Sequence, residues 1–393
     1  MMKRLLIVTL LIAILAAGAF LLWQPSNAAV GTNASLESLL VDSGAEDEAF
    51  ARALVPGAIE FPRDLGPHED YQTEWWYYTG NLETADGRPF GYQFTIFRRA
   101  LQPATAGPSA GAAAASDWRT NQVYLAHFTI SDIADEAFYP AERFSRGAAG
   151  LAGAQAEPYR VWLEDWFVAE TGPGEVHLYA STDEVTLDLR LTETLPPVLH
   201  GDQGLSSKGP EPGNASYYYS IDRQATEGIV TVAGNTYAVS GLSWKDHEYS
   251  TSALSPGSIG WDWFSLQFDN GTSLMFFQIR REDGTLEPAS SGSFIAADGT
   301  VRHLTREDWQ LEVLETWTSP TSGAEYPAGW RLRVPSLNLE LTGAPLMLNQ
   351  ELNVSTVYWE GAVEFSGTLA EEPVAARGYI EMTGYAHSMQ GQI

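Results

Sequence analysis

A carboxylate between two tryptophans, Asp262 flanked by Trp261 and Trp263, opens an apolar strand in the second half of the sequence. Because successive side chains of a strand point to opposite faces, Asp262 shares its face with three apolar residues further along. Burying an unpaired carboxylate is costly, so we expect a partner or a shifted pKa. Asp262 is therefore the first candidate for a general acid, and a buried ion pair between strands is the structural alternative. Trp261 and Trp263 are candidate ligand-binding residues.

A second acid–base cluster, Asp246-His247-Glu248, lies just before this strand. His247 could relay a proton to Asp262, and Asp246 is a further catalytic candidate. Trp244 and Glu248 are candidate ligand-binding residues. In an extended chain His247 points away from the face shared by Asp246 and Glu248, and no metal-binding motif occurs, so we predict no metal site. The sequence has neither a P-loop nor a dinucleotide-binding glycine pattern, so we also predict no cofactor.

Two further carboxylates, Glu74 and Glu360, lie in aromatic strands and are the next candidates for an acid. A carboxylic acid kept protonated by an apolar site could protonate an alkene. Aromatic faces could stabilise the resulting cation by cation–π attraction of about 2 kcal/mol. The structural alternative for each carboxylate is a hydrogen bond to an indole N–H or a tyrosine hydroxyl that ties the fold together. The aromatic neighbours are candidate ligand contacts: Trp75, Trp76, Tyr78 and Tyr358.

The composition excludes several functions. A formal net charge of -28 argues against binding to nucleic-acid phosphates or to anionic lipid. The 393 residues contain no cysteine, which excludes disulfides, a thiolate nucleophile and Cys-based metal sites. The 12% aromatic share is typical of broad β-sheets and aromatic-lined pockets. We expect a monomer that does not bind nucleic acid.

The order of strand and turn signals predicts an all-β protein. Alternating runs at 74–82 and 90–99 are joined by an Asp-Gly turn, a strong hairpin signal, and short strands continue to residue 385. One of these is predicted at 159–169. The strands form two units, 56–222 and 223–390, and closed β-barrels suit them because closure removes sheet edges. The Pro- and Gly-rich stretch 195–216 is expected to be an ordered loop over a site or the junction of the units.

The N-terminus carries the features of a targeting segment. Lys3 and Arg4 precede an apolar run, and small residues follow at a plausible cleavage point, so residues 1–29 are predicted to be a signal peptide or a membrane anchor. Residues 30–55 are then a tether. We expect an exported protein in the periplasm or at the outer face of the inner membrane, with a membrane tether as one outcome.

Four separated stretches together resemble one family. They are residues 71–82, 200–220, 244–263 and 378–385, and they look like the AttH/CrtC-type lipocalin-like family. The match covers about residues 56–388. It implies two tandem lipocalin-like antiparallel β-barrels. The family includes carotenoid 1,2-hydratases, and its exported bacterial members, which this chain resembles more closely, are often described as secreted hydrolases.

The resemblance implies a lipophilic small-molecule ligand, such as an isoprenoid, a polyene or a lipid-like compound, in an aromatic-lined cavity near the barrel junction. The protein is then expected to carry out acid-catalysed hydration, as a hydratase of the lyase class, or hydrolysis as a secreted hydrolase. Two alternatives remain open: a non-catalytic ligand carrier, and a scaffold for a cell-envelope export system whose cavity is filled by side chains.

Overall fold

The computed structural model describes residues 50–103, 120–251 and 254–390. All of them belong to one compact unit, residues 40–393. The predicted targeting segment 1–29 and most of the tether 30–55 lie outside the described residues. Among the residues that are described, no helix is long and apolar enough to cross a membrane.

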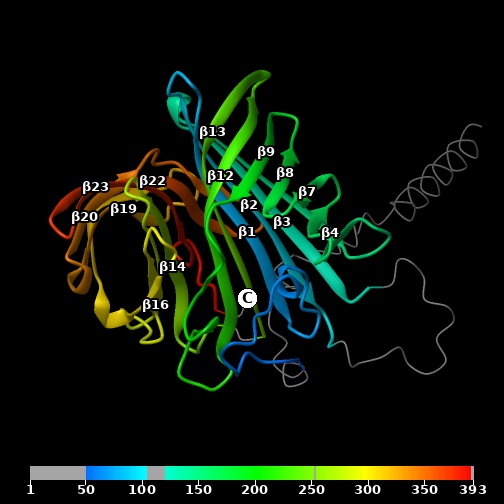
Figure 1. The fold of residues 1–393 in the computed structure, drawn as a ribbon, viewed down its shortest axis with the longest axis horizontal. Helices are drawn as coiled ribbons and strands as arrows, with labels where there is room; N and C mark the ends of the chain where they lie inside the picture. Colours follow the sequence, from blue (N-terminus) through cyan, green and yellow to red (C-terminus); the bar gives the residue numbers. More distant parts are fainter. Residues whose placement is uncertain (1–49, 104–119, 252–253, 391–393) are drawn as a thin grey trace, which may run out of the picture. The chain divides into compact units, whose positions relative to one another are not determined.

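The first half of the described chain forms a 13-stranded antiparallel sheet, in the order β4-β3-β2-β1-β13-β12-β9-β8-β7-β6-β5, with β10 and β11 paired to β12 (Figure 1). The predicted strands at 74–82 and 90–99 are confirmed as β1 and β2, whereas the strand predicted at 159–169 is two strands, β6 and β7, joined by a turn. The strands are β1 (Thr73–Glu83), β2 (Pro89–Ala100), β3 (Gln122–Asp132), β4 (Ala137–Arg146), β5 (Ala152–Gln155), β6 (Arg160–Leu163), β7 (Trp166–Gly172), β8 (Glu175–Ser181), β9 (Val185–Glu193), β10 (Val198–Leu199), β11 (Leu205–Ser207), β12 (Ala215–Val232) and β13 (Asn235–Ser250).

The second half forms a 10-stranded antiparallel sheet, in the order β17-β16-β15-β14-β23-β22-β20-β19-β18, with β21 paired to β22. Its strands are β14 (Ser258–Phe268), β15 (Ser273–Arg281), β16 (Ser291–Ile295), β17 (Val301–Thr305), β18 (Gln310–Thr318), β19 (Glu325–Val334), β20 (Leu339–Pro345), β21 (Glu351–Asn353), β22 (Val357–Leu369) and β23 (Glu372–Met382). Four short 3-10 turns complete the described elements: η2 (Arg63–Leu65), η3 (Ile133–Asp135), η4 (Arg306–Asp308) and η5 (Pro335–Leu337).

Both sheets follow the same plan, in which the first strand pairs with the last: β1 with β13, and β14 with β23. Each pairing order ends at two strands that are consecutive in sequence, β4 and β5 or β17 and β18, and no backbone ladder joins those ends within the described ranges. Each sheet therefore curls into a barrel or half-barrel (Figure 1), which confirms the all-β prediction of two tandem antiparallel barrels.

The change from one sheet to the other falls between β13 and β14, at residues 251–257, and not at the expected boundary 222/223. The expected boundary lies inside β12, which continues to Val232 in the first sheet. A register shift in the pairing of β12 with β13, between Ile221 and Gln224, interrupts the side-chain alternation at this point. This irregularity explains why the sequence pattern restarts there without any change of sheet.

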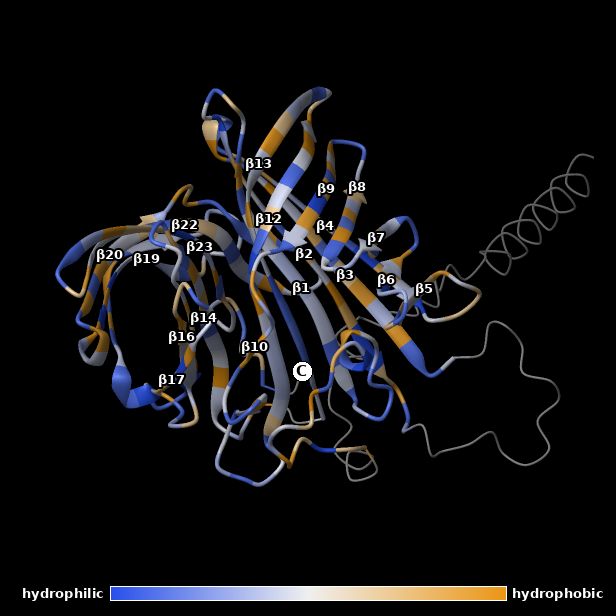
Figure 2. Ribbon diagram, viewed as in Figure 1, coloured by the Kyte–Doolittle hydropathy of each residue, from blue (hydrophilic) through white to orange (hydrophobic). Residues whose placement is uncertain are grey.

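Each barrel has its own apolar core, built by side-chain alternation. Hydrophobic and hydrophilic residues alternate along β9, where Leu187, Leu189 and Leu191 are fully buried (Figure 2). The core of the second barrel contains inward side chains of β14, β15 and β22. A third apolar cluster joins the two sheets and contains Tyr77, Trp244, Trp263 and Tyr379, among others. The two barrels are therefore packed against each other.

Candidate functional site

Neighbouring residues of β13 point alternately to the two faces of the first sheet, and this divides the predicted acid–base cluster. Lys245 and His247 face the interior of the first barrel, where His247 packs on Trp76 with ring centroids 4.9 Å apart. Asp246 faces the second sheet, among residues of the apolar cluster that joins the barrels. The predicted Asp246-His247-Glu248 cluster therefore contributes to two separate networks, one inside the first barrel and one at the barrel junction.

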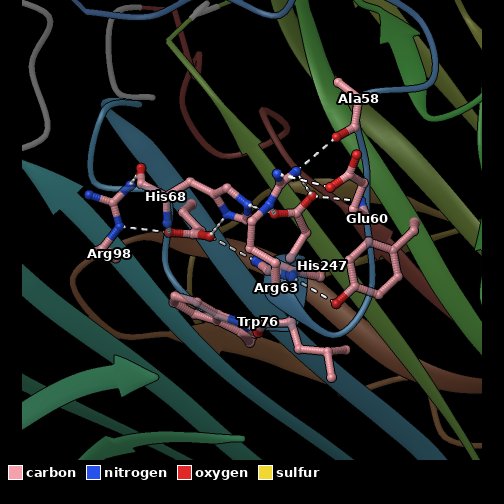
Figure 3. Close-up of polar contacts among 11 residues, drawn as sticks. Ala58, Glu60, Arg63, His68, Trp76, Arg98 and His247 are labelled. Atoms are coloured by element: carbon pink, nitrogen blue, oxygen red, sulfur yellow. Dashed lines mark hydrogen bonds and ion pairs between the residues drawn. The ribbon is translucent and has the colours of Figure 1, made fainter. Parts of the chain in front are cut away.

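The inner network is centred on the Glu74 carboxylate, which is fully buried in β1. Its Oε1 atom lies 2.7 Å from Nδ1 of His68 and 2.8 Å from Nε2 of His247. Its Oε2 atom accepts hydrogen bonds from Nε of Arg98 (2.8 Å) and from the backbone N–H of His68 (2.9 Å). Arg98 and His247 come from the neighbouring strands β2 and β13, and His68 from the loop before β1, so three cationic or imidazole groups converge on one carboxylate (Figure 3).

The far sides of both imidazoles also have partners. Nε2 of His68 lies 3.1 Å from Oδ1 of Asp64, a carboxylate that accepts a hydrogen bond from the Arg63 guanidinium (2.6 Å). Nδ1 of His247 lies 2.9 Å from the Tyr219 hydroxyl. Each ring is thus held in its plane by one partner on each side.

The protonation states follow from these contacts. Burial raises the pKa of Glu74, but the Arg98 charge and hydrogen bonds from both histidines outweigh it and hold the pKa well below its usual range. Burial lowers the pKa of His247 to about 4, so this imidazole is neutral at neutral pH. At His68 burial lowers the pKa, but hydrogen bonds to Asp64 and Glu74 outweigh it and raise the pKa above its ordinary value.

A cavity of about 560 Å³ lies in the first barrel beside this network. Its polar lining includes Lys245, Glu193 and the hydroxyls of Tyr78 and Tyr159, which are 2.8 Å apart. Tyr219 connects the network to the cavity, because its hydroxyl contacts His247 and its ring lies 5.6 Å from Nζ of Lys245. The apolar part of the wall includes Phe61, Leu65, Pro158, Val176 and Pro197.

Lys245 and Glu193 are two of the charged residues that line this cavity. Lys245 is 2% exposed, and its Nζ lies 4.4 Å from the ring centroid of Tyr159 and 5.8 Å from that of Tyr78. Burial lowers the pKa of Lys245 to about 8, with Glu193 opposing the shift. Burial likewise raises the pKa of Glu193, with Lys245 opposing it. The cavity lining thus combines a carboxyl of raised pKa with O–H and N–H donors.

At the barrel junction, Asp246 accepts three hydrogen bonds: from the Tyr218 hydroxyl (2.5 Å), from the indole Nε1 of Trp244 (2.6 Å) and from the Ser220 hydroxyl. Burial raises the pKa of Asp246 to about 7, although these three donors oppose the shift. The Trp263 indole donates to the Tyr218 hydroxyl (2.9 Å). The structure therefore brings Asp246, Trp244 and Trp263 together at the barrel junction.

A second acidic group at the junction is the pair formed by Glu360 and Glu381, which lie opposite each other in β22 and β23. The Tyr77 hydroxyl donates to Glu360 from the first sheet, and the Trp261 indole donates to Glu381. Burial and the Glu381 charge raise the pKa of Glu360 well above its usual range. Burial raises the pKa of Glu381 to about 7. Glu360 thus forms the tyrosine hydrogen bond between barrels that was the structural alternative for it.

The expected pairing of Asp262 with His247 is wrong. Asp262 lies in the second sheet, where Oδ1 is 3.1 Å from Nε of Arg280 and accepts a hydrogen bond from the Tyr385 hydroxyl (3.0 Å). Its Oδ2 accepts a hydrogen bond from Nε2 of Gln278 (2.9 Å). These contacts are the buried ion pair between strands that was the structural alternative. Asp262 and His247 face the interiors of different barrels, because they belong to β14 and β13.

The remaining predicted residues lie outside the cavity. The Tyr358 hydroxyl is 2.7 Å from Nδ1 of His127, and Glu248 forms an ion pair with Lys208 (2.9 Å). Trp75 is partly buried in the apolar cluster between the barrels. Of all the predicted ligand contacts, Tyr78 alone is among the residues that line this cavity. The aromatic residues of the sequence motifs therefore serve mainly to pack the two barrels together.

The stretch 195–216 is ordered, but it includes β10, β11 and the start of β12 rather than being one loop, and it reaches the barrel junction at His200. His200 is fully buried, with Nε2 2.6 Å from the Ser220 hydroxyl and Nδ1 2.9 Å from the Ser293 hydroxyl of the second sheet. Burial lowers the pKa of His200 well below its usual range, so it is a neutral hydrogen-bonding link between the barrels.

Sequence reasoning missed, among others, five residues around the cavity and the inner network. Two of them had a signal: Lys245 shares the β13 face of His247, and Glu193 continues the buried face of Leu187, Leu189 and Leu191. The other three, His68, Arg98 and Tyr219, had none, because nothing in their local sequence shows that they converge on Glu74 and His247.

Comparison with known proteins gives three findings. The AttH-like family model matches residues 52–385. An AttH protein from Nitrosomonas europaea is 34% identical, with a TM-score of 0.74 over 86% of this chain and 100% of that chain. Kievitone hydratase from Nectria haematococca shares the fold, with a TM-score of 0.62 at 17% identity over 86% of this chain and 94% of that chain. A comparison with curated proteins finds no match.

The expected family resemblance is thereby confirmed over both barrels. The matched segment begins just before η2 and ends just after β23, so it contains every residue of the inner network, the cavity and the junction. The protein belongs to the AttH-like family.

Proposed function

We propose that this protein is a hydratase-type enzyme that binds a small, neutral, lipophilic molecule in the cavity of its first barrel. It adds water across a carbon–carbon double bond of that molecule, or removes water in the reverse direction. The observation that carries this proposal is the Glu193 carboxyl, which lines the cavity with a raised pKa beside Lys245 and the Tyr78–Tyr159 hydroxyl pair.

The cavity supports a specific ligand class. Its volume of about 560 Å³ is in the range of small-molecule sites. Four glutamates and one lysine line it, and four negative charges less one positive charge leave a formal excess of three negative charges. These charges would repel a carboxylate or phosphate ligand. A neutral lipophilic molecule could pack on the apolar wall and accept hydrogen bonds from Lys245 and Tyr78 through one oxygen atom.

The arrangement favours a double bond conjugated with a carbonyl. Lys245 and the one free O–H of the Tyr78–Tyr159 pair hold the carbonyl oxygen, and Glu193 takes a proton from water as the water oxygen bonds to the β carbon. The electron pair of the double bond forms a new double bond between the α carbon and the carbonyl carbon, and the carbonyl electron pair moves onto the held oxygen. Glu193 then returns its proton to the α carbon, so one water molecule is added in total. An isolated alkene suits the site less well, because its cation would form beside the Lys245 ammonium.

The comparisons support this class of reaction. Kievitone hydratase shares the fold over most of both chains, and a hydratase adds water to its substrate. The identity of 17% indicates a shared fold, so the reaction and the substrate of this chain are our proposal. The cavity also favours a ligand-binding protein over a scaffold whose barrels are filled by side chains.

We also propose that the protein acts outside the cytoplasm, in the periplasm or at the outer face of the inner membrane. The support is the basic and apolar pattern of residues 1–29. Cell fractionation with N-terminal sequencing of the purified protein tests this: an intact N-terminus in the cytosolic fraction would refute export.

The test of the reaction uses a panel of α,β-unsaturated ketones in ¹⁸O-labelled water, with mass spectrometry of the products. Glu193→Gln is expected to lower kcat by about 10²-fold or more, because it removes the group that transfers the proton. The matched control is Glu312→Gln, the same substitution at an ion-paired residue of the second barrel, which should leave turnover unchanged. Wild-type turnover by Glu193→Gln would refute the proposal. Recovery of a bound lipophilic compound that the wild-type protein never converts would support the carrier instead.

A further inference from the structure

We infer that His68, Glu74 and His247 form a binding site for a first-row divalent transition-metal ion, with Zn²⁺ as the first candidate. Each residue offers one ligand atom, and the three atoms lie within 4.8 Å of one another. The site is separate from the cavity, because none of the three residues lines it. The inference goes beyond the proposed hydration and does not depend on it.

The set of ligand atoms is the first argument. Two imidazole nitrogens and one carboxylate oxygen are a frequent zinc ligand set in which a further position stays open. Both nitrogens already lie against the same oxygen, at 2.7 Å for His68 and 2.8 Å for His247. Tetrahedral coordination at zinc bond lengths places ligand atoms about 3.3 Å apart, so both nitrogen–oxygen distances must widen by about 0.5 Å and the two nitrogens must lie about 3.3 Å apart, within the 4.8 Å that now spans all three atoms.

The partners of these ligands are the second argument. Histidines that bind metals almost always have a hydrogen-bond partner at the other ring nitrogen, which fixes the ring and its tautomer. Here that partner is Asp64 for His68 (3.1 Å) and the Tyr219 hydroxyl for His247 (2.9 Å). The carboxylate is fixed in the same way, because Arg98 and a backbone N–H bind only Oε2 and leave Oε1 facing the two rings. Figure 3 shows His68, Arg98 and His247 converging in this manner.

The local charges indicate the expected strength. The carboxylates of Glu74 and Asp64 are paired with the guanidinium groups of Arg98 and Arg63, so the cluster has no surplus negative charge. We therefore expect weaker binding than at a closed four-ligand zinc site. An ion would enter beside His68, whose side chain is 14% exposed, whereas Glu74 and His247 are fully buried.

The test uses the tag-free full chain, stripped with EDTA and dialysed, and titrated with ZnCl₂ by calorimetry and by metal analysis. We expect one Zn²⁺ per chain, a rise in the thermal midpoint with added Zn²⁺, and no comparable effect of Mg²⁺, which prefers oxygen ligands. His68→Asn should weaken Zn²⁺ binding at least tenfold, because it removes the most exposed ligand. Asp64→Asn should weaken it about tenfold or more by releasing the His68 ring.

The matched control is His177→Asn, an imidazole of β8 that pairs with Asp188 at the surface (2.7 Å). It should bind Zn²⁺ as the wild-type chain does. Equal binding by His68→Asn and wild type, loss of binding in His177→Asn, or no saturable binding at all would each overturn the inference. His247→Asn is the second ligand variant and should also weaken Zn²⁺ binding; it is chosen over Glu74→Gln, which would leave Arg98 without its charge partner. The two proposals are tested separately. If the EDTA-treated protein still hydrates its substrate, the proposed function holds without the metal, and Zn²⁺ binding alone decides the metal inference.

Discussion

The Glu360–Glu381 pair at the barrel junction predicts that a single amide substitution removes a large pH dependence of stability. Burial raises the pKa of Glu381 from its ordinary value of 4.5 to about 7. The folded protein therefore binds a proton that the unfolded chain releases at lower pH. Below the unfolded pKa this proton binding stabilises the fold in full, and the contribution is lost as the pH rises through about 7.

The size of the effect follows from the shift. One pKa unit corresponds to about 1.4 kcal/mol, so the shift from 4.5 to about 7 corresponds to about 3 kcal/mol of unfolding free energy lost with rising pH. In Glu381→Gln the neutral amide keeps an oxygen for the Trp261 indole N–H and cannot ionise beside Glu360. The variant should therefore gain about 3 kcal/mol relative to wild type between about pH 4 and about pH 8.

Urea denaturation followed by tryptophan fluorescence measures this difference, with wild type and variant compared at each pH so that titrating groups away from the Glu360–Glu381 pair cancel. Glu364→Gln is the matched control, because Glu364 is exposed on the same strand as Glu360. Its difference from wild type should not change with pH. A pH-independent difference for Glu381→Gln as well would refute the reasoning, because it would mean that Glu381 titrates normally in the folded protein.

Two further substitutions test the assignment of the charged groups. Lys245→Met should raise the unfolding free energy at neutral pH by about 3 kcal/mol, because burial lowers the lysine pKa from 10.5 to about 8. The same substitution should weaken ligand binding. Unchanged stability in a thermal melt would contradict the predicted gain in stability. Asp262→Asn should lower the free energy of unfolding by about 1–3 kcal/mol, because Arg280 loses its charge partner. The turnover of the folded variant should equal that of the wild type. Loss of turnover with wild-type stability would instead show that Asp262 is the catalytic acid.

The junction and the cavity show why sequence motifs point to the wrong part of a fold such as this one. Residues of the motifs meet across the two sheets: the Trp244 and Trp263 rings lie 6.3 Å apart between centroids, and the Tyr77 hydroxyl donates to Glu360. Residues at such an interface form recognisable sequence motifs because the side chains of two sheets must fit one another. The side chains that line the cavity face an open space, so they need not fit a packed partner. Two of them, Lys245 and Glu193, stand outside any sequence motif.

Much of this protein was determined by the sequence alone. Alternating strands, tight turns and four family motifs predicted two tandem antiparallel barrels of the AttH-like family, because these depend on short-range patterns and on local turn chemistry. Alternation also required that Asp246 and His247 face opposite sides.

Only the tertiary structure decided which groups meet. It placed Asp262 against Arg280 rather than His247, moved the change of sheet to 251–257, and brought His68 and Arg98 to Glu74. Strand order and register set these contacts over long distances in the chain. The pKa of a buried group follows from its neighbours and its exposure, and for that reason no single stretch of sequence contains the chemistry of the site.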